Sequence, residues 1–154
     1  MCGIYGAIGF SPSGTEKINL RKSLLRMSSQ SRGRDGHGVY DWELGFIGVS
    51  RAQPLPEGDV VPLPLIYDNL VMVFNGTLSN DQELTQKYDF PKSVVDTWTA
   101  VRLWEKQGWR ACEEFVGGFV FGVFDKSSQI LTVAKNFKTL WYIRSLDYFM
   151  FASE

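Results

Sequence analysis

The chain has 154 residues, of which 44% are hydrophobic, 21% are charged and 14% are aromatic, and its formal net charge is −1. This length and composition are typical of a soluble globular protein with one domain and one core. The chain has no basic stripe, no run of about 18 apolar residues and no signal-peptide pattern, so we expect a cytoplasmic protein that neither spans a membrane nor binds nucleic acid as its main ligand.

The first half of the chain predicts strands around one helix. The expected elements, in chain order, are a strand over 2–10, a helix over 15–29, a glycine-rich loop over 32–38, strands over 37–42 and 44–50, a proline-containing loop over 51–64, and a hairpin over 65–67 and 70–74. We expect the helix to pack through the apolar residues Ile18, Leu24, Leu25 and Met27.

The second half predicts helices followed by strands. The expected elements are a helix that begins at Ser79 or Asn80 and ends near Lys87, a helix over 95–107, a short helix over 109–116, and strands over 118–125, 129–135, 140–144 and 148–152 that complete a meander. The strand over 118–125 is apolar on both faces, which is typical of a central strand. We therefore expect two stacked sheets with helices outside them.

Cys2 directly follows the initiator Met1. Removal of Met1 is favoured when the next side chain is small, and it would leave Cys2 with both a thiol and a free α-amine. An unperturbed α-amine has a pKa near ~7.7–8.0, so it can act as a base at neutral pH. A terminal nucleophile served by its own amine is an established catalytic arrangement. The alternative is that the thiol packs as a small hydrophobic group.

The chain has two cysteines and one histidine, which limits the other chemistry available. Without a secretory signal we expect reduced thiols, and Cys112 in its helical stretch is expected to be a buried structural thiol. A zinc site needs three or four nitrogen or sulfur ligands, so we expect no metal and no cofactor. His37 lies between two glycines and is a poor mount for a general base, which favours the α-amine in that role.

Four further features are candidates for a site. Arg51 follows a strand, Asn75-Gly76 ends a strand, Asp96 begins a helix, and the loop over 32–38 can close over a cavity. Each has a plainer interpretation. The arginine can be solvated or paired with a carboxylate, the Asn-Gly pair can be only a turn, the aspartate can be a helix cap, and the loop can be only a loop.

Together with Cys2, these features resemble the class II glutamine amidotransferases, the glutaminase domains of the N-terminal nucleophile hydrolase superfamily, and most of all the asparagine synthetase type. The matching segments are Met1-Cys2-Gly3-Ile4, Arg32-Gly33-Arg34-Asp35-Gly36, Asn75-Gly76-Thr77-Leu78-Ser79-Asn80, Val95-Asp96-Thr97, the strand over 117–125, and Phe151-Ala152-Ser153-Glu154. The resemblance runs from the first residue to the last with order and spacing preserved. It implies an α+β fold, a four-layer αββα sandwich of two stacked, mostly antiparallel sheets flanked by helices, in a single domain over 1–154.

The resemblance also implies the chemistry. Cys2 is the nucleophile with its own α-amine as base, and the Asn75 side chain and the Gly76 backbone N–H form the oxyanion hole. The thiolate attacks the side-chain amide of glutamine, ammonia leaves, and a γ-glutamyl thioester is hydrolysed.

L-glutamine is the substrate that the resemblance implies, and its charged ends have assigned partners. Arg51 holds the α-carboxylate, for which its bidentate fork is suited, and Asp96 holds the α-ammonium. Arg32 and Thr77 complete the implied substrate-binding set. Thr77 stands where the family has an acid, so Asp96 carries more of the ammonium binding.

The resemblance predicts a glutaminase domain that lacks a synthetase or acceptor domain and supplies ammonia to a partner synthetase. Two alternatives stay open: a catalytically idle glutamine-binding or scaffold subunit of an amidotransferase complex, and an N-terminal-cysteine amidase that acts on another amide. The sequence gives no indication of the ammonia acceptor or of the oligomeric state.

Overall fold

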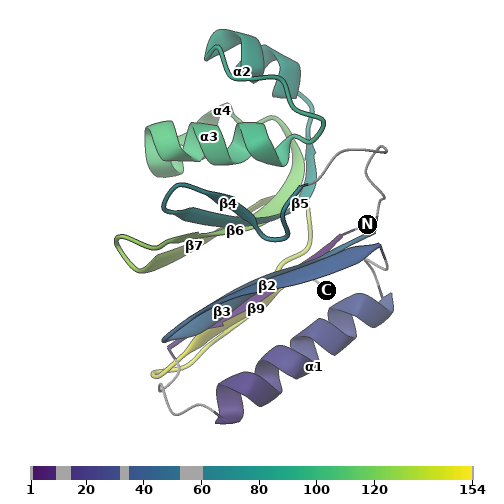
Figure 1. The fold of residues 1–154 in the computed structure, drawn as a ribbon, viewed down its shortest axis with the longest axis vertical. Coiled ribbons are helices and arrows are strands. Elements are labelled where there is room, and N and C mark those ends of the chain that lie inside the picture. Colours follow the sequence, from purple (N-terminus) through teal and green to yellow (C-terminus); the bar gives the residue numbers. More distant parts are fainter. Residues whose placement is uncertain (1, 10–14, 32–34, 53–60, 154) are drawn as a thin grey trace.

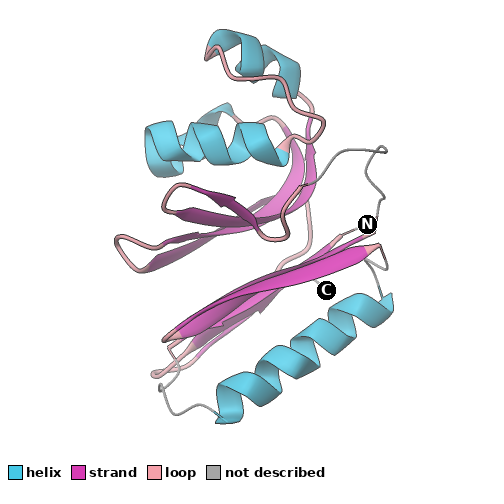
Figure 2. Ribbon diagram, viewed as in Figure 1, coloured by secondary structure: helices cyan, strands magenta, loops and turns pink. Residues whose placement is uncertain are grey.

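The computed structural model describes residues 2–9, 15–31, 35–52 and 61–153. Two antiparallel sheets stack on each other, and helices cover both outer faces (Figures 1 and 2). The four-layer αββα arrangement and the α+β fold expected from the sequence are therefore confirmed. None of the described helices has the length and apolar character needed to cross a membrane.

The first sheet contains, in spatial order, β2 (Gly36–Trp42), β3 (Gly45–Arg51), β1 (Gly3–Ile8), β9 (Phe149–Ala152) and β8 (Trp141–Arg144). The second sheet contains β4 (Leu65–Tyr67), β5 (Leu70–Leu78), β6 (Gly117–Asp125) and β7 (Ile130–Asn136). Outside the first sheet lies α1 (Thr15–Ser31), and on the side of the second sheet lie α2 (Asp81–Lys87), α3 (Thr97–Gln107), a 3-10 turn (Gly108–Arg110) and α4 (Ala111–Glu114) (Figure 1).

Three apolar layers hold these four layers together, because alternate residues of each strand face opposite ways. On β5, Met72 and Phe74 pack toward the helices of the second sheet, whereas Val71 and Val73 pack between the two sheets. On the outer face of the first sheet, Tyr5 and its neighbours pack against α1. The apolar character of both strand faces, which the sequence shows, thus reflects a sheet that is covered on both sides.

The ring of Phe151 fills the middle of the layer between the sheets. A Cβ atom placed on Gly6 would lie 2.6 Å from Cε1 of this ring, and one placed on Gly122 would lie 2.9 Å from its Cζ. The two glycines belong to opposite sheets, on β1 and β6. Their missing side chains are therefore what lets a single phenyl ring bridge the two sheets.

The strands differ from the sequence-based expectation in two respects. The strand expected to end at Phe74 continues to Leu78, because its pairing with β6 extends to the pair Leu78 and Gly117. The last strands do not form one meander. β7 ends the second sheet, whereas β8 and β9 belong to the first sheet, where β9 pairs with β1.

The helices also differ in detail. Leu24 and Leu25 of α1 pack on the first sheet as expected, but Ile18 and Met27 are 52% and 63% exposed, so they are not part of its packed face. The expected helix over 109–116 is shorter, since it consists of the 3-10 turn and the single turn of α4. The strand expected to begin at His37 begins one residue earlier, so Gly36 of the expected glycine-rich loop is already part of β2.

The start of β1 is fastened to the residue that follows β9. The Ile4 N–H donates a hydrogen bond to the Ser153 hydroxyl at 3.0 Å, and the Ser153 N–H donates to the Ile4 carbonyl at 2.9 Å. Ser153 is 2% exposed, so its hydroxyl serves a backbone group that water does not reach. This double contact fixes the chain two residues after Cys2.

We expect Ser153→Ala to lower the free energy of unfolding by about 1–3 kcal/mol, because the buried Ile4 N–H would lose its acceptor. Urea unfolding measures this loss. The exposed turn residue Ser128 provides a matched control, and Ser128→Ala is expected to change the free energy by less than about 0.5 kcal/mol. Equal effects of the two substitutions would show that the Ser153 hydroxyl does not hold β1.

Candidate active site

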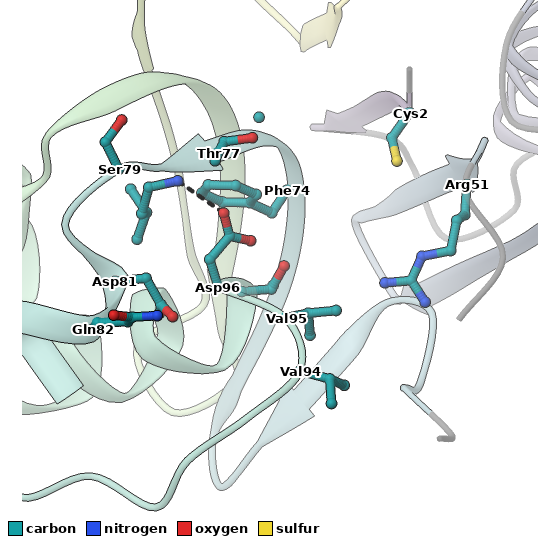
Figure 3. Close-up of a pocket in the computed structure, with 13 residues that line it drawn as sticks. Cys2, Arg51, Phe74, Thr77, Ser79, Asp81, Gln82, Val94, Val95 and Asp96 are labelled. Atoms are coloured by element: carbon teal, nitrogen blue, oxygen red, sulfur yellow. Dashed lines mark hydrogen bonds between the residues drawn. The ribbon is translucent and has the colours of Figure 1, made fainter. Parts of the chain in front are cut away.

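A cavity of about 570 Å³ lies beside the N-terminus of β1. Its walls come from Cys2 and Arg51 of the first sheet, from 74 and 76–79 at the end of β5, from 81–82 of α2, and from 94–97 at the start of α3. Figure 3 shows Cys2 and Arg51 on one side and Thr77, Asp81 and Asp96 on the other. Residues that are distant in the sequence thus line the same cavity.

Strand pairing brings Cys2 and Arg51 to the same wall. In the antiparallel pair of β1 and β3, Gly3 lies opposite Ser50, so the next residues outward are Cys2 and Arg51. The Cys2 thiol is free and half-buried, and it also lines a small adjoining cavity of about 30 Å³ together with Arg51. The predicted nucleophile and the predicted carboxylate ligand are therefore neighbours.

Gly76 lines the cavity on the opposite sheet, at a place where no side chain fits. Its φ is +155°, and a Cβ atom would lie 2.3 Å from the carbonyl oxygen of Gly118 on β6. The backbone of Gly76 thereby borders the cavity directly.

Asn75 takes a different position from the one that the sequence suggests. It is 4% exposed and does not belong to the described wall of the cavity. It alternates with Phe74, which packs toward the helices, and its partner across β6 is Val120 of the layer between the sheets. Its side chain therefore faces the first sheet, whose strand β1 directly follows Cys2.

Asp96 is the residue before α3, but it does not cap that helix with its side chain. Its Oδ2 instead accepts a hydrogen bond of 2.8 Å from the N–H of Leu78, the last residue of β5. Burial raises the pKa of Asp96 above its ordinary value, the Leu78 hydrogen bond lowers it, and the negative charge of Asp81 raises it again. The carboxylate thus joins β5 to α3 and stands in the wall of the cavity.

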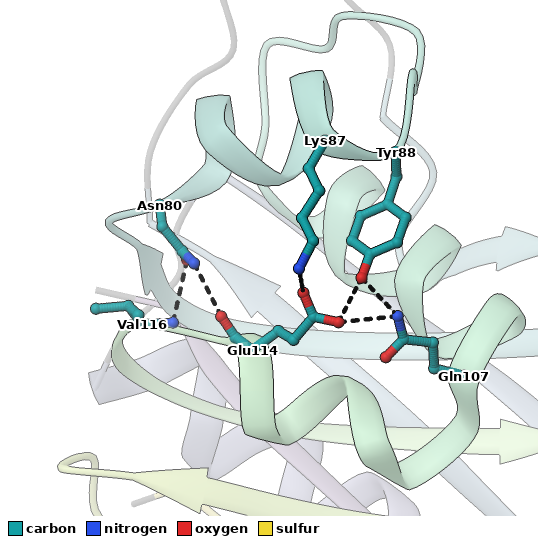
Figure 4. A network of polar contacts seen from close by, with 6 residues as sticks. All are labelled: Asn80, Lys87, Tyr88, Gln107, Glu114 and Val116. Carbon is teal, nitrogen blue, oxygen red and sulfur yellow. Dashed lines mark hydrogen bonds and ion pairs between the residues drawn. The ribbon is translucent and has the colours of Figure 1, made fainter.

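A polar network holds α2 and its neighbours in place (Figure 4). Asn80 donates from Nδ2 to the Glu114 carbonyl at 2.8 Å and accepts at Oδ1 from the Val116 N–H at 3.1 Å. The Glu114 carboxylate pairs with Lys87 at 2.6 Å and accepts hydrogen bonds from Tyr88 and Gln107.

The hydrogen bond from Lys87 is the largest cause that lowers the pKa of Glu114, to about 2, and those from Tyr88 and Gln107 lower it further. Glu114 is therefore ionised at neutral pH. Together with Asn80, it ties the turn between β5 and α2 to the segment that follows α4.

Most predicted site residues reach the cavity, and one unpredicted residue joins them. Cys2, Arg51, Gly76, Thr77 and Asp96 line it, as expected for one site. Arg32 lies outside the described residues. Sequence reasoning missed Asp81, which also lines the cavity, because an acid at the start of a helix has an ordinary local role.

Cys112 and His37 are not among the described residues that line the cavity. Cys112 is half-buried, less than expected, and burial raises the pKa of its thiol. It packs beside the helix-side core of the second sheet. His37 is an exposed residue of β2, opposite Ser50.

Comparison with known proteins identifies what this arrangement is similar to. A family model described as a glutamine amidotransferase domain matches residues 1–154. The chain is 26% identical over 178 residues to a Methanocaldococcus jannaschii protein named as a glutamine-hydrolyzing asparagine synthetase, and 25% identical over 201 residues to a 7-cyano-7-deazaguanine synthase of Saccharolobus solfataricus. The alignments cover 100% and 99% of this chain but 34% and 43% of those proteins. The chain thus spans about a third to two fifths of their length.

A solved structure shares the fold. Glutamine phosphoribosylpyrophosphate amidotransferase from B. subtilis, in complex with ADP and GMP, superposes with a TM-score of 0.71 over 99% of this chain and 42% of its own. The two sequences are 19% identical, so the likeness concerns the fold.

The raised pKa of Asp96 predicts a pH dependence of stability. The folded state holds this proton to a higher pH than the unfolded chain, whose carboxyl has the ordinary pKa of 3.8. The free energy of unfolding therefore falls as the pH rises from that value through the raised one. Asp96→Asn removes this loss. We expect the stability of the variant relative to the wild type to increase over this range and to level off near neutral pH, as measured by urea unfolding at a series of pH values.

Asp89→Asn serves as the matched control, because Asp89 is an exposed carboxylate. Its difference from the wild type is expected to stay within about 0.5 kcal/mol at every pH. If Asp96→Asn showed a difference that did not change with pH, burial of Asp96 would not raise its pKa.

Proposed function

Because this chain belongs to the class II glutamine amidotransferases, we propose that it hydrolyses L-glutamine to glutamate and ammonia with Cys2 as the nucleophile. The observation that carries this proposal is that three groups border one cavity: a free thiol, an arginine and a half-buried aspartate, which are Cys2, Arg51 and Asp96. These three groups match what a thiolate reaction on a zwitterionic amino acid requires.

The charged ends of glutamine decide how it binds. Arg51 offers a planar fork of donors to the α-carboxylate. Oδ2 of Asp96 accepts the hydrogen bond from the Leu78 N–H, and we assign the α-ammonium to Oδ1. An ammonium group beside Asp96 also offsets the cost of burying that carboxylate. Holding both ends directs the side-chain amide toward Cys2.

In the proposed reaction the α-amine of Cys2 takes the thiol proton, and the thiolate attacks the amide carbon of glutamine. The tetrahedral intermediate collapses when the protonated amine returns the proton to the departing nitrogen, which leaves as ammonia. Water, deprotonated by the same amine, then attacks the γ-glutamyl thioester and releases glutamate and the thiol. This sequence requires that Met1 has been removed.

The oxyanion of the intermediate needs two donors. We assign these to the Gly76 N–H, which borders the cavity, and to the Asn75 side-chain amide, which faces the first sheet. Donors held in place before the reaction stabilise the developing charge without reorganising.

We propose that the ammonia passes to a synthetase. Two relatives are named as synthetases, and in both the aligned part is less than half of the protein. A glutaminase reaction coupled to a separate synthetase activity accounts for this organisation.

Cys2→Ala is expected to abolish glutamate formation from glutamine, because alanine cannot form the thioester. The other thiol supplies the control, and Cys112→Ala is expected to leave the rate within a factor of about two. Coupled detection of glutamate measures both. Undiminished glutamate formation by Cys2→Ala would refute the proposed nucleophile.

The N-terminus of the purified protein needs a parallel check, because the mechanism uses a free α-amine. Intact-protein mass spectrometry is expected to show a chain that lacks Met1. An active protein that retains Met1 would show that another group acts as the base.

Asn75→Ala is expected to reduce kcat for glutamine by about 10²–10³, as loss of one oxyanion donor does in other acyl transfers. KM is expected to change little, because this contact forms only in the transition state. Steady-state kinetics separate the two effects, and circular dichroism confirms that the variant is folded. A raised KM with unchanged kcat would assign Asn75 to substrate binding instead.

A further inference from the structure

The cavity wall contains a second carboxylate that the proposed reaction does not use. Asp81 is the first residue of α2, is half-buried and lines the cavity on the side of Asp96 (Figure 3). Its Oδ1 is shielded from solvent and has no hydrogen-bond partner among the described residues. The negative charge of Asp81 also acts on Asp96, since it is one of the causes that raise the pKa of Asp96.

This arrangement costs free energy in the empty protein. A carboxylate oxygen removed from water without a donor carries the full penalty of desolvation. Electrostatic repulsion between the negative charges of Asp81 and Asp96 adds a second cost. The opposite charge among the cavity-lining residues of the described chain is Arg51, across the cavity (Figure 3). A cation bound on the side of Asp81 and Asp96 would offset the repulsion between the two carboxylates and would be attracted by the charge of Asp81.

The chemistry of that cation follows from the surrounding groups. No third histidine, cysteine or acidic side chain joins the two aspartates in the described part of the chain, so the pair suits an ammonium group better than a divalent metal ion. An ammonium group has three donors, and the carboxylates are acceptors. The separation of Arg51 from these two acids gives the cavity one positive and one negative side, as a free amino acid requires.

Attraction to the N-terminus of α2 is a weaker explanation for Asp81. The helix has seven residues, and its first turn carries a second acid, Glu83, which is exposed and does not line the described cavity. Both acids would serve the helix dipole in the same way. What distinguishes Asp81 is its place in the cavity wall and its effect on Asp96.

We propose that Asp81 is a specificity-determining residue of this site, whose negative charge acts with Asp96 to select substrates that carry a free α-ammonium group. The inference rests on the proposed function and deepens it. Asp96 makes the hydrogen bond to the ammonium, and Asp81 contributes through its charge. The site should therefore reject glutamine analogues whose α-amine is missing or blocked.

The test compares glutamine with glutaramic acid, which keeps the amide and the carboxylate but lacks the α-amine. Isothermal titration calorimetry in a Cys2→Ala background gives the dissociation constants without turnover. Asp81→Asn is expected to reduce the preference for glutamine over glutaramic acid by about 3- to 10-fold, the size expected of a partly screened charge pair. The dissociation constant of glutaramic acid is expected to stay the same or to fall.

Two variants serve as controls. Glu83→Gln removes a charge from the same helical turn and is expected to leave the preference unchanged. Asp81→Glu keeps the charge and is expected to retain most of the preference, which separates charge from side-chain shape if Asp81→Asn folds poorly.

Several outcomes would overturn the inference. These are an unchanged preference in Asp81→Asn, equal weakening of both ligands, loss of the preference in Asp81→Glu, and absence of glutamine binding. Glutamine turnover by the unsubstituted protein is measured separately. Turnover with an unchanged preference refutes only the role of Asp81, whereas a reduced preference without turnover refutes the glutaminase and leaves the role of Asp81 standing.

Discussion

The site depends on the pairing of β1 with a strand on each side. β3 on one side sets Gly3 opposite Ser50 and thereby places Cys2 beside Arg51. On the other side β9 pairs with β1, and Ser153 closes the pair through its double contact with Ile4. A terminal residue is ordinarily the most mobile part of a chain. Here Cys2 directly precedes the central strand of a five-stranded sheet, which gives it the defined position that the proposed nucleophile needs.

The opposite wall of the cavity contains two carboxylates, Asp81 and Asp96, whose placement lowers the stability of the protein. Asp96 is half-buried with a raised pKa, and one oxygen of Asp81 has no donor among the described residues. The contacts of Glu114 with Asn80 and Lys87 hold the turn before α2 and the helix itself, and thereby the position of Asp81. Unfavourable charge that is held in place by favourable contacts elsewhere is typical of functional sites, where activity is gained at some loss of stability.

Sequence reasoning predicted the parts of the fold and site that local pattern determines. The apolar faces of the strand over 117–125 indicate a doubly covered sheet. Cys2, Arg51 and Asp96, which the sequence motifs group into one predicted site, border one cavity. It could not predict that the last two strands leave the second sheet, because pairing between β9 and β1 is a contact across almost the whole chain. It missed Asp81 for a similar reason. An acid at the start of a helix has an ordinary local role, and only the fold shows that this one borders a cavity.

Covalent trapping tests the central claim most directly. A diazoketone analogue of glutamine carries its electrophilic carbon where the side-chain amide would lie, and peptide mass spectrometry identifies the residue that it modifies. The proposed mechanism predicts one adduct, on Cys2 of a chain without Met1, which excess glutamine prevents from forming. Modification of Cys112 instead of Cys2, or no adduct on a protein that separate titration shows to bind glutamine, would contradict the assignment of Cys2 as the nucleophile.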